Sequence, residues 1–99
     1  MIFDILPFFA ELLGTFLFIS VVLFQGTPVT IGLSLIIVIL LVGRLSGGHV
    51  NPAISFVMWM KNDISATKLI AYIIAQLLGG YIALILYKRR GPVGHILPF

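Results

Sequence analysis

Long runs of apolar residues alternate with short polar segments along this chain. Three runs, residues 6–24, 29–45 and 65–87, are each close to the roughly 20 residues that a helix needs to cross the ~30 Å hydrocarbon core of a bilayer. The segments between them carry the turn-forming and charged residues, so each run predicts one transmembrane helix. Residues 88–99 open with three basic residues and predict an irregular basic tail.

A fourth segment, residues 46–61, breaks the pattern with two glycines and an Asn-Pro pair. Asn51 is a favoured N-cap, and Pro52 suits the first turn of a helix because its missing N–H would be unsatisfied there. The predicted helix ends near Met60, and its roughly nine residues cover ~14 Å, about half of the hydrocarbon core. Non-helical backbone at membrane depth is tolerated only where protein buries it or water lines it. The segment therefore predicts a re-entrant loop and half-helix beside a lined cavity.

Composition agrees with an all-α integral membrane protein. Hydrophobic residues make up 61% of the chain and charged residues 9%, which excludes an ordinary soluble domain. The net charge of +3 resides in short segments between the helices, which favours orientation in a bilayer and not a nucleic-acid partner. The chain has no cysteine, so it has neither disulfides nor thiolate metal sites, and we expect no cofactor. We expect a multi-pass protein of a plasma or inner membrane.

Glu11 is the only acidic residue inside a predicted span. Because a carboxylate at the bilayer centre costs at least ~2.5 kcal/mol on insertion scales, it is expected to face the protein interior and to have a partner there. His49, the other titratable residue predicted at membrane depth, is the candidate partner. The alternative is that Glu11 lies near enough to the interface to be hydrated. The two residues come without a nucleophile motif or a metal-ligand set, so the sequence does not predict an enzyme.

Small residues recur every four positions on one face of the third span. They are Ala71, Ala75, Gly79 and Ala83. This row predicts a groove where another helix backbone approaches closely, and Gly14, four positions after Ala10, gives the first span a shorter version. Gln76 lies one position from the row, so we expect it to hydrogen-bond to protein and not to face lipid.

Three motifs, taken in order, resemble one family. They are Ala10-Glu-Leu-Leu-Gly-Thr-Phe-Leu17, Ser46-Gly-Gly-His-Val-Asn-Pro-Ala-Ile-Ser55 and Tyr72-Ile-Ile-Ala-Gln-Leu-Leu-Gly79. They are similar to the first helix, the first pore loop and the third helix of aquaporins and glycerol facilitators, the major intrinsic proteins. The chain thus resembles the N-terminal half of such a channel. The resemblance implies three transmembrane helices plus one re-entrant half-helix, and passive transport of water or a small neutral solute such as glycerol.

The resemblance also implies roles at the tip of the half-helix. Asn51 would direct its carboxamide into the pore and donate to a passing oxygen, while Pro52 and Ala53 would hold the tip against a partner half-helix. The positive end of the half-helix dipole would oppose cations and protons.

The loop before the half-helix receives roles from the same resemblance. Backbone carbonyls of Gly47 and Gly48 would accept hydrogen bonds from the solute, and His49 would line the pore with them. Glu11 would brace the loop through His49, and Gln76 would belong to the same brace.

Two features depart from the family pattern. Ile31, twenty positions before Asn51, falls where the family usually has an aromatic residue at the outer constriction, which weakens any expectation of strict water selectivity. The family pore also needs a second, inverted half with its own Asn-Pro-Ala followed by an arginine. This chain has one Asn-Pro-Ala, and Ile54 follows it.

Three hypotheses follow from these departures, two of which differ in how the second half of the channel is supplied. Two copies could associate head to tail, because the Lys and Arg residues divide equally between the two sides and either orientation could insert; such pores could gather into tetramers, as the family's do. Alternatively, the chain is the product of a truncated or split gene, and another chain supplies the second half or the fragment does not conduct. The third hypothesis is a small holin-like membrane-lesion protein with a basic tail, in which Asn51 and Glu11 have no role.

Overall fold

A computed structural model describes residues 2–90 of the chain. Its four helices are α1 (Ile2–Phe24), α2 (Pro28–Ser46), α3 (Pro52–Met60) and α4 (Ala66–Lys88). The helices α1, α2 and α4 are long and apolar enough to cross a membrane, whereas the nine residues of α3 reach about half as far. The described residues therefore form the all-α membrane fold that the sequence predicted. Most of the predicted basic tail, residues 91–99, lies outside the described residues.

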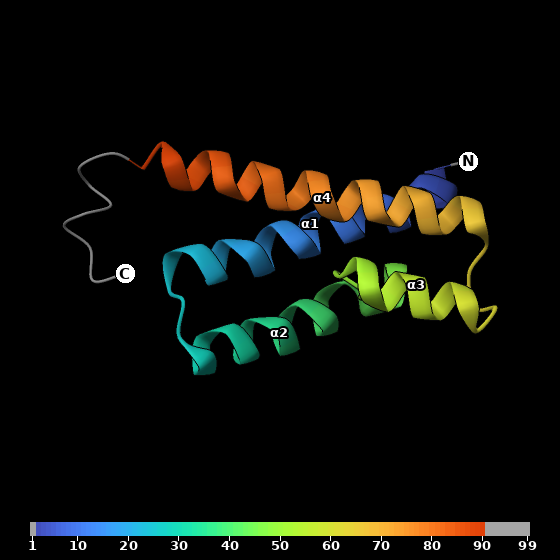
Figure 1. The fold of residues 1–99 in the computed structure, drawn as a ribbon, viewed down its shortest axis with the longest axis horizontal. Helices are drawn as coiled ribbons and strands as arrows, with labels where there is room; N and C mark the ends of the chain where they lie inside the picture. Colours follow the sequence, from blue (N-terminus) through green and yellow to red (C-terminus); the bar gives the residue numbers. More distant parts are fainter. Residues whose placement is uncertain (1, 91–99) are drawn as a thin grey trace.

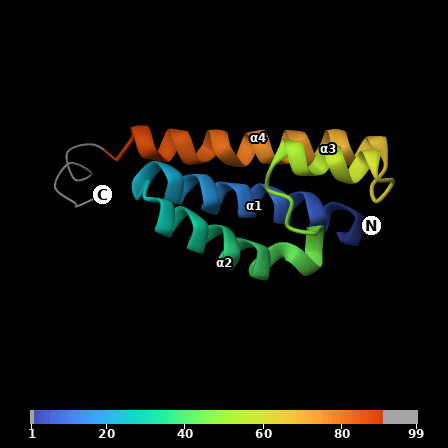
Figure 2. The same ribbon diagram turned by 60° about the horizontal axis from the view of Figure 1, so that its bottom comes forward.

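Helix α1 is the centre of the bundle. It packs against α4 on one side and α2 on the other, while α3 packs against the first part of α4 (Figures 1 and 2). The helices α1 and α4 run in the same direction and α2 runs in the opposite one (Figure 1). Helix α3 starts near the middle of the bundle and ends where α1 and α4 begin, so its N-terminus lies halfway along the spanning helices (Figure 1).

Local sequence sets the ends of these helices. The side chains of Thr27, Asn51 and Ser65 cap α2, α3 and α4 by accepting a backbone N–H at 3.2, 2.8 and 3.1 Å. Helix α2 ends at Ser46 and is capped by Gly47, whose φ of 93° is left-handed and costs glycine little. The ends of α2 and α4 lie within one residue of those expected from sequence, whereas α1 begins four residues earlier. An acidic residue in its first turn, Asp4, favours that earlier start.

The small core lies between α1, α2 and the loop that follows α2. Ala10, Val38, Val42 and Val50 form it. Gly14 lies among them: a Cβ at this position would be 2.9 Å from Val50 Cγ1 and 3.1 Å from a methyl group of each of the other two valines. Because Gly14 has no side chain, α1 can contact α2 and the loop at the same position.

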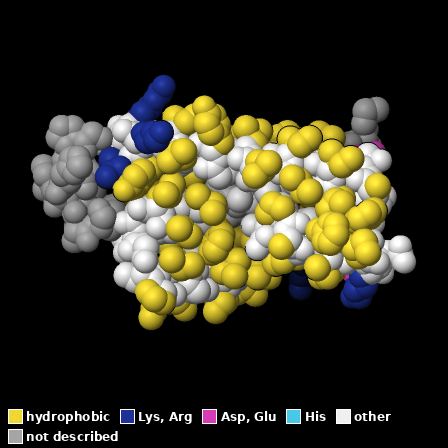
Figure 3. Space-filling view, viewed as in Figure 1, with side chains coloured by type: hydrophobic (Ala, Val, Ile, Leu, Met, Phe, Trp, Pro, Cys, Tyr) yellow, Lys and Arg dark blue, Asp and Glu magenta, His cyan; other side chains and the backbone are white. Residues whose placement is uncertain are grey.

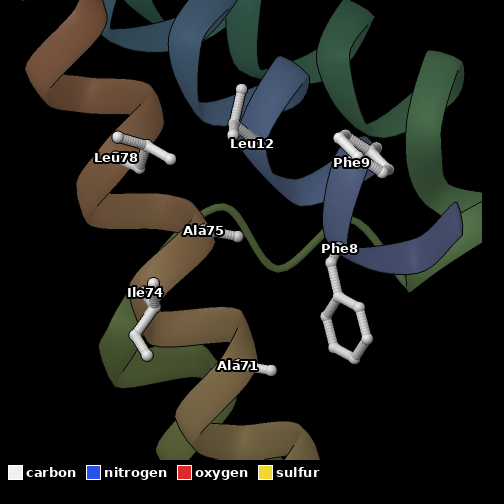
Figure 4. A pocket seen from close by; sticks show the side chains of 7 residues that line it. All are labelled: Phe8, Phe9, Leu12, Ala71, Ile74, Ala75 and Leu78. Atoms are coloured by element: carbon white, nitrogen blue, oxygen red, sulfur yellow. The ribbon is translucent and has the colours of Figure 1, made fainter. Parts of the chain in front are cut away.

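The backbones of α1 and α4 lie very close together at Gly79. A Cβ there would overlap the carbonyl oxygen of Leu12 and lie 3.0 Å from the backbone nitrogen of Phe16. Ala75 and Ala83 are buried with it. Ala71 is only half-buried and lines an open apolar groove of about 290 Å³ between the two helices (Figure 4). At Ala71, the first residue of the row, the two helices are therefore no longer in close contact.

Most of the remaining surface is apolar. Figure 3 shows hydrophobic side chains across one whole face, with Lys and Arg side chains toward its two ends. Helix α2 exposes apolar side chains on the sides that do not contact α1, namely Leu33, Ile36, Ile37, Leu40 and Leu41. Such a surface suits lipid or further helices, and the chain is a multi-pass integral membrane protein.

Replacing Gly79 with alanine is expected to destabilise the fold, because the new methyl group overlaps backbone atoms of α1 that cannot rotate away. Overpacking of this kind costs about 1–3 kcal/mol, which should appear as a lower thermal-unfolding midpoint in detergent. Gly80→Ala is the matched control, since a Cβ there would be 3.8 Å from Ile19 Cγ1. Equal midpoints for the two variants would show that α1 and α4 do not meet at position 79.

Candidate functional site

A carboxylate buried in α1 holds the loop between α2 and α3. Glu11 is 0% exposed, so it is not hydrated at an interface. Its Oε2 accepts from Ser46 Oγ at 2.6 Å and from the His49 backbone N–H at 2.9 Å. Its Oε1 accepts from the Val50 backbone N–H and from Gln76 Nε2, both at 2.8 Å. Four donors therefore offset the cost of burying this group.

His49 contacts Glu11 through its backbone and not through its ring. The imidazole Nδ1 lies 2.8 Å from Ser55 Oγ, and the ring packs edge-on against Tyr72 with centroids 5.0 Å apart. The expectation that Glu11 and His49 pair thus names the right two residues and the wrong group of His49. Backbone N–H groups in a non-helical loop have no helical acceptor, so they take the carboxylate.

Gln76 links α4 to α1 and α3, and it hydrogen-bonds within the protein as we expected from the sequence. Its Nε2 donates to Glu11 in α1 and, at 2.9 Å, to Ser55 in α3. Ser55 is completely buried. Sequence reasoning did not single out Ser55 or Tyr72. The available signals were a hydroxyl within an otherwise apolar half-helix and an aromatic residue four positions before Gln76, on the same helix face.

The backbone of the loop is strained at Val50 and is held by hydrogen bonds to two helices. Gly47 and Gly48 have φ values of 93° and 64°, and Val50, a β-branched residue, has a φ of 45°. A positive φ costs glycine little, whereas at a β-branched residue such as Val50 it costs about 1–3 kcal/mol. At Val50 it is offset by the hydrogen bond to Glu11 and by the buried side chain. The Tyr72 hydroxyl also donates to the Ser46 carbonyl at 2.6 Å, so the start of the loop is held from α4.

The tip of α3 is open, in contrast to the loop behind it. Asn51 and the next three residues are exposed, and a shallow apolar depression begins there, lined by Ala53, Ile54, Val57 and Met58. Asn51 Oδ1 accepts the capping N–H of Ala53 at 2.8 Å, which leaves the N–H groups of the carboxamide for another partner. The tip can thus offer N–H donors and the positive end of a helix dipole to a neutral polar molecule.

Other residues predicted for the site lie at its edges or apart from it. Gly47 is exposed, while Gly48 is buried against α2, where a Cβ would lie 3.5 Å from the Gly43 Cα. Ile31 is in the first turn of α2, roughly 22 Å along the helix from its last residue. It does not join the hydrogen-bonded cluster. Among residues 2–90, no three His, Cys, Asp or Glu residues lie close enough to hold a metal ion.

Comparison with a family model and with curated proteins indicates one family. The family model described as major intrinsic protein matches residues 5–92. The chain is 38% identical over 89 residues to "Aquaporin Z" of Photorhabdus laumondii, which covers 75% of this chain and 38% of the relative. It is 38% identical over 85 residues to "Glycerol uptake facilitator protein-like 6" of Lactiplantibacillus plantarum, with 77% and 39% covered. The match to "Aquaporin-8" of Rattus norvegicus is 35% over 97 residues, with 87% and 37% covered.

The chain therefore spans less than two fifths of the length of each of these relatives. No solved structure gives a significant match.

Substitution of Glu11 should destabilise the protein in proportion to the acceptors removed. Glu11→Leu leaves the N–H groups of His49 and Val50 without their acceptor, at about 1–3 kcal/mol for each buried donor. Glu11→Gln keeps one acceptor oxygen but turns an N–H₂ group toward donors, so its effect should be intermediate. Thermal unfolding in detergent gives the order. Asp63→Asn, which removes an exposed ion pair with Lys61, is the control and should change stability by less than about 1 kcal/mol. A Glu11→Leu variant as stable as this control would show that the hydrogen bonds of Glu11 do not hold the loop.

Proposed function

Because the chain belongs to the major intrinsic protein family, we propose that it forms the loop-bearing half of a channel that passes water or small neutral solutes such as glycerol. The observation that carries the proposal is the N-terminus of α3, an exposed tip halfway along the bundle, backed by a buried hydrogen-bonded network around Glu11. The names of the relatives, aquaporin and glycerol uptake facilitator, support the same class of permeant. Channel transport requires no catalytic group.

The proposed conduction depends on donors at the tip and acceptors in the loop. The Asn51 carboxamide is oriented by its cap, so its N–H groups would donate to the oxygen of a passing molecule. The carbonyls of Gly47 and Gly48 would accept from its hydroxyl groups. The positive end of the α3 dipole would repel cations and, with the fixed donors, interrupt proton relay.

We further propose that a second half completes the channel, either an antiparallel copy of this chain or another chain. The exposed apolar side of α2 and the depression at the tip of α3 are surfaces that another set of helices could cover. The basic residues support the antiparallel copy, because each end has three. Arg44, Lys61 and Lys68 lie at one end, and Lys88, Arg89 and Arg90 lie at the other. Such a balance gives no preferred orientation.

Proteoliposomes of the wild-type chain should shrink or swell faster than empty liposomes under a gradient of a small neutral osmolyte, without ionic current. Asn51→Asp should lower this flux while α3 keeps its cap, since Asp caps helices as well as Asn does. Asn51→Ala should lower it as well, and should also lose about 1 kcal/mol of stability with the cap.

Asn62→Asp, in the exposed turn after α3, is the matched control and should conduct like the wild type. A homogeneous, inserted preparation no more permeable than empty liposomes would favour a non-conducting fragment. Free passage of ions would favour the membrane-lesion hypothesis.

Orientation can be tested separately in intact cells. Single cysteines at positions 61 and 88, at opposite ends of the bundle, should each be about half accessible to an impermeant thiol reagent if copies insert both ways. The chain has no native cysteine, so each label reports one site. Full labelling of one position and none of the other would exclude the antiparallel copy and leave a separate second chain.

A further inference from the structure

The hydrogen bonds around Ser55 determine where the protons of the buried network lie, and the first step concerns Gln76. Its Nε2 lies 2.8 Å from Glu11 Oε1 and 2.9 Å from Ser55 Oγ. The reverse orientation of the amide would place its oxygen against a carboxylate oxygen that already accepts the Val50 N–H. The amide nitrogen therefore faces both groups and uses one N–H for each. Toward Gln76, the Ser55 hydroxyl is an acceptor.

The second step concerns the single proton of that hydroxyl. Ser55 is completely buried, and its Oγ contacts Gln76 Nε2 and His49 Nδ1. Of these two atoms only Nδ1 can accept, so among residues 2–90 it is the one acceptor that the structure offers to the proton. Donation from Oγ requires Nδ1 to be without a proton. The opposite arrangement would leave a buried hydroxyl proton unpaired, which is unfavourable.

The third step locates the other ring nitrogen of His49. Nε2 lies next to Gly47, since a Cβ on that residue would be 3.2 Å away, and Gly47 is exposed. Nε2 makes no hydrogen bond within residues 2–90. The buried side-chain atoms that lack a partner in this range are Thr15 Oγ1 and Gln76 Oε1, and Nε2 is not among them. Nε2 is therefore not a buried atom and reaches the surface of the loop. The edge-on contact with Tyr72 helps to fix the ring in this position.

From these steps we infer that Ser55 and Gln76 hold His49 as the neutral imidazole with its proton on Nε2, so that the loop presents a second N–H donor in addition to the Asn51 carboxamide. The group it would bind is an uncharged oxygen acceptor, such as water or a hydroxyl of a small polyol. This role toward the solute rests on the proposed function, whereas the position of the proton does not. Ser55 and Gln76 act as positioning residues, because neither presents its own polar group at the surface.

Nitrogen NMR of the protein in lipid bilayers tests the inference directly. Histidine is labelled with ¹⁵N, and His95, the other histidine of the sequence, is replaced by Gln so that one imidazole reports. The expected spectrum shows a directly bonded proton on Nε2 and none on Nδ1. A proton on Nδ1, or on both nitrogens at neutral pH, would overturn the inference.

A substitution distinguishes positioning from folding. Ser55→Ala should preserve the fold, since alanine is a good helix former, but should release Nδ1 and give a mixture of the two neutral tautomers. Ser34→Ala is the matched control: it removes a hydroxyl that donates to the Ile31 carbonyl at 2.8 Å, outside the network, and should leave Nε2 protonated. A single Nε2–H tautomer in Ser55→Ala would show that Ser55 does not set the proton.

Titration with glycerol tests the donor role apart from transport. The Nε2 resonance should shift progressively as glycerol is added to the protein. Addition of a small aliphatic compound without hydroxyl groups should leave the resonance unchanged. An Nε2 signal unaffected by glycerol would overturn the donor role. If the signal shifts while proteoliposomes show no flux, the proposed channel function fails and the donor site stands.

Discussion

The carboxylate of Glu11 is the interaction on which the rest of this structure depends. It lies in the central helix and accepts hydrogen bonds from the end of α2, from two backbone groups of the loop and from α4. The backbone N–H groups of His49 and Val50 would otherwise be buried without a partner, at about 1–3 kcal/mol apiece. One acidic group thus joins three elements and compensates for a loop that no regular secondary structure could satisfy.

Close packing makes this arrangement possible. Gly14 lets α1 contact the valines of α2 and the loop, and Gly79 lets α4 approach the backbone of α1. Without these two approaches, Gln76 and the loop amides would not come within hydrogen-bonding distance of the same carboxylate. The packing also holds Val50 at a positive φ, which fixes the direction in which the chain enters α3.

The two sides of the loop differ in how far their polar groups are satisfied. On the inner side, the carboxylate of Glu11, the hydroxyl of Ser55 and the amide nitrogen of Gln76 are all hydrogen-bonded within the protein. On the outer side, the N–H groups of the Asn51 carboxamide lie at the surface, together with Nε2 of His49, which we infer to carry the proton of the ring. A rigid inner network with N–H donors at the adjoining surface is consistent with the proposed passage of a neutral polar molecule.

The sequence by itself determined the number of membrane spans, the half-helix from Pro52 to Met60 and the capping role of Asn51. These depend on hydropathy over about 20 residues and on caps two or three residues away, both of which are local. It also indicated that Glu11 must be paired, because an unpaired carboxylate is too costly in a membrane. Only the tertiary structure decided which donors pair with it, that the His49 ring turns to Ser55, and that Ala71 lines a groove. Those outcomes depend on how helices as far apart in sequence as Glu11 and Gln76 are rotated against each other, and on competition between backbone and side-chain donors for the same oxygens.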